Sequence, residues 1–182
     1  MKASFTSAFL GALILAAIST AGDFVWANWR VRHLAVYGVI HGVVMFAAAG
    51  YVLGWRNGRG PISAIGGVIA GVAGALSFYA LRPILGYSAM FVSWILVWVV
   101  LGYAVKAGGA AKAGVTRGVA AALLSGVAFY LVSGMWMPFN PSGPLDYAEH
   151  FVRWTIAFLP GFAALLLAGR SPFVVSSLSY SL

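Results

Sequence analysis

The chain has 182 residues, of which 62% are hydrophobic and 8% charged, and its net charge is +8. A soluble domain carries roughly a quarter charged residues, so this composition excludes a soluble protein with a polar surface. The chain contains no cysteine, which excludes disulfides, zinc–thiolate sites and cysteine-held iron–sulfur clusters. The placement of the positive charge fits membrane orientation better than nucleic-acid binding, so we expect no nucleic-acid partner.

The first apolar segment admits two interpretations. Met1 and Lys2, followed by the apolar run from Phe9 to Ile18 and then by small residues, match a cleavable signal peptide ending near residue 21. However, a single lysine is a weak positive region, and the segment approaches the length that spans a bilayer. We therefore favour a first transmembrane helix over residues 4–22.

Six apolar segments of spanning length follow one another along the chain. About 20 apolar residues cross the hydrocarbon core, and charged residues with proline and glycine clusters separate segments of that size. The predicted helices cover residues 4–22, 34–54, 62–81, 86–105, 118–137 and 154–169. All eleven basic and three acidic residues lie between these segments or at the termini. The predicted fold is all-α, a six-transmembrane-helix bundle forming a single transmembrane domain over residues 1–182.

The charged residues between the helices predict an orientation. If the odd-numbered helices run outward, the cytoplasmic side receives seven basic residues and no acid: Lys2, Arg56, Arg59, Lys106, Lys112, Arg117 and Arg170. The other side receives four basic residues and all three acids: Arg30, Arg32, Arg82, Arg153, Asp23, Asp146 and Glu149. This is the positive-inside bias. We expect cytoplasmic termini and a multi-pass membrane protein, in the inner membrane if the chain is bacterial.

Two helices carry faces of small residues. Gly67, Gly71 and Gly74 share one face of the helix at 62–81, and Gly118 and Gly126 lie on one face of the helix at 118–137. Small residues let helix backbones approach closely in lipid. Such faces serve packing within the bundle or a homo-oligomer interface, and we favour packing within the bundle.

The outer half of the predicted bundle carries polar and aromatic groups. His41, Trp94 and Tyr130 each lie roughly 10–12 Å below the outer surface, counted at ~1.5 Å rise per residue. Trp94 and Trp98 lie one turn apart, and each indole N–H needs a partner in a membrane interior. These two residues either fill the core or line a ligand cavity. The predicted ligand-binding residues are His41, Ser93, Trp94, Trp98, Tyr130, Ser133 and Pro160.

Pro160 is included because Pro160 and Gly161 should break or kink the last helix in its outer half, although a tolerated bend is the favoured interpretation. Such a kink helps to open a cavity towards the lipid. The proline-containing segment 138–144 before that helix predicts a loop with rigid turns. Residues 145–153 predict an additional turn of helix in the membrane interface.

Other chemistries find little support in the sequence. A membrane haem needs two histidines at matching depth, and only His41 lies inside a span. Asp146, Glu149 and His150 share one loop, where solvation at the interface is favoured over a metal site. No acid accompanies His41 in a catalytic triad, and no span contains the carboxylate that proton-coupled transport usually employs. We expect no metal, no cofactor and no catalytic residue. An enzyme acting on lipid through His41 or His150 remains an alternative hypothesis.

The second half of the chain has a characteristic order of features. A helix bearing Trp94 and Trp98 precedes the basic, glycine-bearing loop 106–117. The next helix has an aromatic outer end, and a proline-containing loop follows. The last helix begins at Arg153 and Trp154, contains Leu159 and Pro160, and ends at residues 169–170. Over residues 86–170 this order resembles the Insig family of sterol-regulated membrane proteins.

The resemblance implies six helices with cytoplasmic termini around a central cavity that binds a lipid-like molecule. The chain looks shorter at both ends than eukaryotic members and lacks the cysteines of animal members, which is typical of a prokaryotic-type homologue. We therefore expect a non-enzymatic membrane protein that binds a sterol-like or other neutral lipid. The alternative is a small facilitative transporter, or the substrate-binding subunit of one.

Overall fold

The computed structural model describes residues 2–29, 33–55, 57–106, 110–133 and 146–167. These residues form six α-helices and one short 3₁₀ helix, η1, without a strand, which confirms the all-α class. The elements are α1 (Lys2–Asn28), α2 (Leu34–Trp55), α3 (Gly60–Leu85), η1 (Gly86–Ser88), α4 (Ala89–Lys106), α5 (Ala111–Ser133) and α6 (Tyr147–Leu167).

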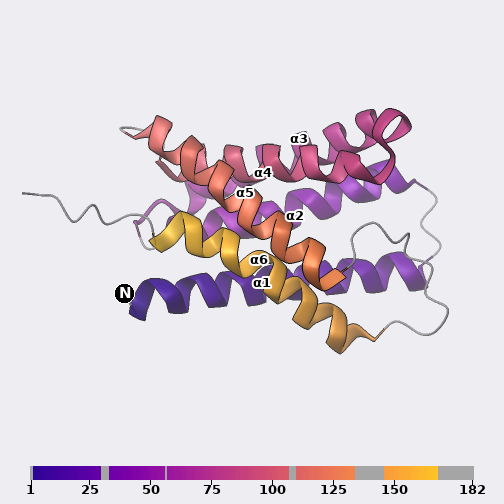
Figure 1. Cartoon of the computed structure of the whole chain (residues 1–182), viewed down its shortest axis with the longest axis horizontal. Coiled ribbons are helices and arrows are strands. Elements are labelled where there is room, and N and C mark those ends of the chain that lie inside the picture. The colour runs from indigo at the N-terminus through magenta and orange to yellow at the C-terminus, as the bar shows by residue number, and fades with distance from the viewer. Residues whose placement is uncertain (1, 30–32, 56, 107–109, 134–145, 168–182) are drawn as a thin grey trace, which may run out of the picture.

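The helices pack as a ring around a common interior. Starting from α1, the extensive contacts run to α6, α5, α4, α3 and α2 in turn, and a thinner contact between α2 and α1 closes the ring. Successive helices run in opposite directions along the long axis of the molecule (Figure 1). The first and last helices lie side by side.

Four helical stretches are long and apolar enough to cross a membrane by length and composition. They are Phe5–Asn28, Leu34–Trp55, Gly60–Lys106 and Ala111–Val132. The third stretch contains both α3 and α4, which fold back on one another at η1. The composition of these helices is that of a membrane protein.

Several helices extend beyond the predicted spans and take charged residues with them. α1 continues to Asn28, α3 to Leu85, and α5 begins at Ala111. Several charged residues therefore lie within helices, and their predicted placement in connections is wrong: Asp23, Arg82, Lys112, Arg117, Glu149 and Arg153. A charged residue need not end a helix, because the backbone hydrogen bonds continue through it and arginine is a good helix former. The predicted helix ends at residues 137 and 169, and the loop 138–144, lie outside the described residues.

The last helix begins at Tyr147, before the predicted span at 154–169. This agrees with the additional turn of helix predicted for residues 145–153. The Asp146 side chain accepts hydrogen bonds from the backbone N–H groups of Ala148 (2.9 Å) and Glu149 (3.0 Å), which is an N-cap. α6 is then continuous through Pro160, so the helix is not broken there, in agreement with the favoured interpretation of a tolerated proline. Neighbouring helices can accommodate proline in a membrane helix.

The small-residue faces lie between helices of the same bundle. A Cβ atom on Gly67 would overlap the carbonyl group of Phe46, and one on Gly71 would overlap Gly42, so α2 and α3 meet backbone to backbone. Gly118 lies equally close to the backbone of α4 at Trp98. The structure confirms the predicted packing role for Gly67, Gly71 and Gly118, whereas an added Cβ on Gly126 would meet only Trp94 Cδ1 at 4.0 Å. A homo-oligomer interface stays a prediction.

Candidate functional site

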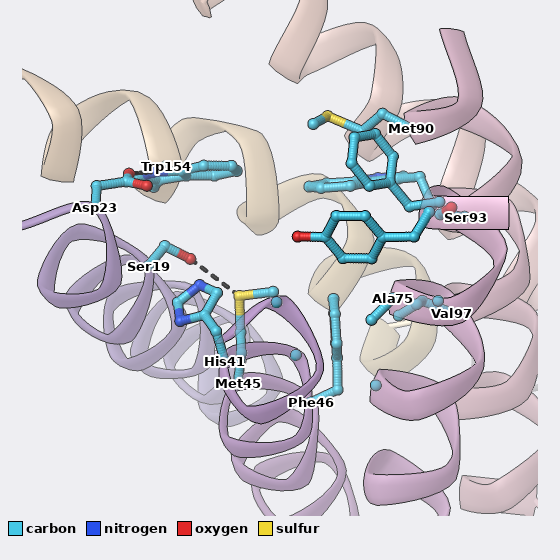
Figure 2. A pocket seen from close by; sticks show the side chains of 17 residues that line it. Ser19, Asp23, His41, Met45, Phe46, Ala75, Met90, Ser93, Val97 and Trp154 are labelled. Atoms are coloured by element: carbon cyan, nitrogen blue, oxygen red, sulfur yellow. Dashed lines mark hydrogen bonds between the residues drawn. The ribbon is translucent and has the colours of Figure 1, made fainter. Parts of the chain in front are cut away.

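A cavity of about 240 Å³ lies inside the ring, between α1, α2, α3, α4 and α6. We call it the chamber. Its apolar walls come from Met45, Phe46, Phe78, Met90 and Val97. The polar and aromatic groups that line it are Ser19, Asp23, His41, Tyr79, Ser93, Trp94 and Trp154. Figure 2 shows Ser19, His41 and Met45 facing Ser93, Ala75 and Val97 across this space.

The predicted ligand-binding residues separate into two groups. His41, Ser93 and Trp94 line the chamber, whereas Trp98, Tyr130 and Pro160 do not. Trp98 is fully buried in the core, whereas the Tyr130 side chain is 45% exposed on the surface of the bundle. Ser133 is the last residue of α5, and its side chain lies outside the described atoms. Equal depth in the bundle did not indicate which way each side chain points.

His41 reaches the chamber because α1 has a glycine beside it. A Cβ atom on Gly22 would overlap the imidazole ring of His41, so the glycine makes room for that ring. The ring also stacks on Tyr37, with 6.0 Å between ring centroids. The Tyr37 hydroxyl donates a hydrogen bond to the backbone carbonyl of Gly22. α1 and α2 thus hold the imidazole in one orientation at the chamber wall.

Trp94 is held by partners within the protein. Its indole Nε1–H donates to the Ser125 hydroxyl (3.2 Å), which donates in turn to the Ala157 carbonyl (2.6 Å). Its ring lies nearly parallel to those of Phe129 and Phe158, at centroid distances of 5.4 and 5.6 Å. The indole N–H is therefore satisfied without a ligand. Trp94 presents its aromatic surface to the chamber.

The smaller polar groups of the chamber are also internally bonded. Ser93 shares a hydrogen bond with Ser77 (2.8 Å), and Ser19 donates to the Met45 sulfur (3.0 Å). Such groups add little polarity to the space that they line. Apart from the His41 imidazole, the chamber wall therefore offers little polarity, and the carboxylate that lines it is that of Asp23.

Asp23 belongs to a polar cluster that the sequence did not predict. Asp23 Oδ2 accepts a hydrogen bond from Trp154 Nε1 (3.0 Å) and lies 3.4 Å from His150 Nδ1. The sequence placed Asp23 and His150 in separate loops. The extensions of α1 and α6 bring the two together. The signal available in the sequence was the apolar run that continues past Asp23 through Phe24 to Trp26.

A second cavity, of about 270 Å³, opens beyond the chamber, and we call it the vestibule. It shares Asp23, Phe78 and Tyr79 with the chamber. Its remaining lining residues are Trp26, Leu34, Arg82, Tyr87 and His150. These residues come from the C-terminal ends of α1 and α3, the N-terminal ends of α2 and α6, and η1. The vestibule therefore lies at the bundle end that the charge pattern assigns to the outer side.

No family model, curated protein or solved structure matches the chain. The resemblance to the Insig family therefore stays a prediction. Any function must accordingly be inferred from the chamber and the vestibule themselves, through their shape, their lining residues and their charges.

Proposed function

We propose that the chain is a non-enzymatic, multi-pass membrane protein that binds a sterol-like or other neutral lipid in the chamber. The observation that carries this proposal is a mostly apolar chamber between five helices that shares Asp23, Phe78 and Tyr79 with a more polar vestibule at one end of the bundle. An amphiphile has the same division into an apolar body and a polar end. Sites for small molecules are typically apolar cavities with a few oriented polar groups.

In this proposal all six helices cross the bilayer, with both termini in the cytoplasm. The shortest helix, α4, has 18 residues, which corresponds to about 27 Å at ~1.5 Å per residue. That length is close to the ~30 Å of the hydrocarbon core. α6 is not among the four stretches that are long and apolar enough to cross a membrane, and the ring places it between α1 and α5. The vestibule then opens at the outer interface, where a lipid headgroup lies.

Filling the chamber tests the proposal. Ala75 on α3 lines the chamber, whereas Ala80 on the same helix is exposed and lies outside it. Each chain is purified in mild detergent, and the bound lipid is extracted and quantified by mass spectrometry. We expect the wild type and Ala80→Phe to retain an enriched amphiphile. The amount of lipid retained by Ala75→Phe should fall roughly tenfold, because the phenyl ring occupies volume that the lipid would fill, and a clash of ~1–3 kcal/mol corresponds to that factor.

Thermal unfolding of each variant shows whether it remains folded. If the wild type carries no enriched lipid, or if Ala75→Phe retains as much as Ala80→Phe, the proposal is wrong. Solute uptake by proteoliposomes, without retained lipid, would instead favour the facilitative transporter. The carboxylate of Asp23 at the chamber end gives that alternative the acidic group that we did not expect within a helix.

A further inference from the structure

The vestibule holds two opposite charges that do not neutralise one another. Asp23 and Arg82 both line it, yet among the described residues the close partners of Asp23 are Trp154 and the His150 imidazole, and the arginine that pairs with an acid is Arg153, with Glu149. An acid and an arginine in one partly enclosed space would normally pair. Their separation leaves one negative and one positive group facing the same cavity.

Asp23 keeps one carboxylate oxygen available to a ligand. Both partners of Asp23, Trp154 and His150, contact Oδ2. Within the described part of the chain, Oδ1 accepts no hydrogen bond, and the side chain is 33% exposed. A carboxylate offers about four lone-pair sites. Asp23 can therefore accept hydrogen bonds from a cationic donor in the vestibule while Trp154 still holds it in place.

Arg82 has aromatic rather than acidic neighbours among the residues that the structure describes. Its guanidinium carbon lies 5.5 Å from the ring centroid of Tyr87 and 6.0 Å from that of Phe78, which are cation–π contacts. Cation–π contacts use the face of the guanidinium group, so its N–H groups can still donate hydrogen bonds to an oxyanion. Arginine is well suited to bind phosphate in this way. Arg82 lies in the last turn of α3, where the helix dipole favours a cation.

We propose that the vestibule recognises a zwitterionic headgroup, with an ammonium at Asp23 Oδ1 and a phosphate oxyanion at Arg82. The apolar part of the same lipid extends into the chamber. The aromatic rings of Trp26 and Tyr79 in the vestibule wall add favourable surfaces for an ammonium. Such a lipid has no net charge. This inference rests on the proposed function and names the lipid class for that site.

Three single-chain lipids with the same acyl chain test the proposal on the full-length protein in detergent. Lysophosphatidylethanolamine carries both charges, lysophosphatidylglycerol carries only the phosphate, and monoacylglycerol carries neither. We expect the wild type to bind lysophosphatidylethanolamine at least about tenfold more tightly than monoacylglycerol, because charge-assisted hydrogen bonds are the strong ones. Soluble glycerophosphoethanolamine serves as the headgroup without a chain and should bind far more weakly than the lipid.

Two charge-removing variants separate the roles. Asp23→Asn should remove the preference for lysophosphatidylethanolamine over lysophosphatidylglycerol. Arg82→Gln should reduce binding of both phospholipids by about tenfold relative to monoacylglycerol. Monoacylglycerol binding is the internal control for a folded chamber. Arg153→Gln is the matched control, because Arg153 pairs with Glu149 outside the vestibule.

Three outcomes overturn the inference in different ways. If monoacylglycerol binds the wild type as tightly as lysophosphatidylethanolamine, or if the variants leave the preferences unchanged, the headgroup inference alone is wrong. Equal binding of glycerophosphoethanolamine and the lipid indicates a site for a soluble zwitterion and overturns the lipid assignment. Failure of all three lipids to bind overturns this inference, and the proposed function falls with it only if the purified wild type also retains no enriched lipid.

Discussion

At the scale of single residues, Trp98 is the side chain whose removal should cost the most stability. It is 0% exposed, meets Phe162 edge-to-face at 5.9 Å, and its ring lies directly against Gly161. We expect Trp98→Ala to lower the free energy of unfolding by ~3–5 kcal/mol, because it leaves a large cavity. The change is measured by unfolding the protein in detergent and monitoring its helix content by far-UV circular dichroism.

Tyr103 on the same helix is the control. Its side chain is exposed on the outside of the ring, so Tyr103→Ala should change stability by less than ~1 kcal/mol. Equal losses in the two variants would contradict the central position of Trp98.

The sequence predicted the depth of the site residues but not their direction. His41 and Trp94 both reach the chamber from the predicted outer half, whereas Tyr130, at the same depth, lies outside it. Helices in lipid can be apolar on all sides, so no polar face marks which side points inward. The neighbour Phe129 takes the buried position on α5 instead, stacked against Trp94.

At the scale of the helices, the close approach of α2 and α3 makes a specific prediction about glycine. Gly67→Ala places a methyl group against the carbonyl of Phe46, and that backbone can yield only if the helices separate. We expect a loss of roughly 1–3 kcal/mol in the free energy of unfolding. Gly126 is the matched control, because the nearest atom to an added Cβ is Trp94 Cδ1 at 4.0 Å.

Gly126→Ala should therefore be neutral or stabilising by up to ~1 kcal/mol, since alanine favours the helix more than glycine. Thermal unfolding of both variants in the same detergent compares them directly. A Gly67→Ala protein as stable as Gly126→Ala would show that α2 and α3 are not packed as closely as the structure places them.

The apolar segments of the sequence predicted how many α-helices the described residues form and where each lies in the chain, but they did not predict where the helices end. Charged residues predicted the limits of the apolar core, yet α1 runs past Asp23 and α3 runs past Arg82. These extensions create the vestibule, because they carry both side chains on ordered helix ends. The polar part of the site was therefore missed for the same reason that the helix ends were misplaced.

At the scale of the whole molecule, the order of the helices around the ring could not be predicted from the sequence. Six antiparallel apolar helices permit several arrangements, and the small-residue faces restrict only two of the neighbouring pairs, α2 with α3 and α4 with α5. α1 packs against α6, so the first and the last helix of the chain are neighbours. That pairing places Trp154 beside Asp23, 131 positions apart in the sequence.

The orientation of this ring in the membrane is the last prediction, and the absence of cysteine makes it simple to test. Asn57, Ser88 and Ala110 are exposed residues in the connections around α3, η1 and α4. With six spans and cytoplasmic termini, a membrane-impermeant maleimide should label Ser88→Cys on intact cells. It should label Asn57→Cys and Ala110→Cys only after permeabilisation, and the cysteine-free wild type gives the background.

Each alternative topology gives a different labelling pattern. Labelling of Asn57→Cys and Ala110→Cys on intact cells, with Ser88→Cys protected, would reverse the orientation that the seven cytoplasmic basic residues predict. If Asn57→Cys and Ala110→Cys are labelled on opposite sides, the stretch from Gly60 to Lys106 crosses the membrane only once and the six-span arrangement is wrong. The expected pattern instead places the vestibule at the outer surface, where Asp23 and Arg82 meet lipid headgroups.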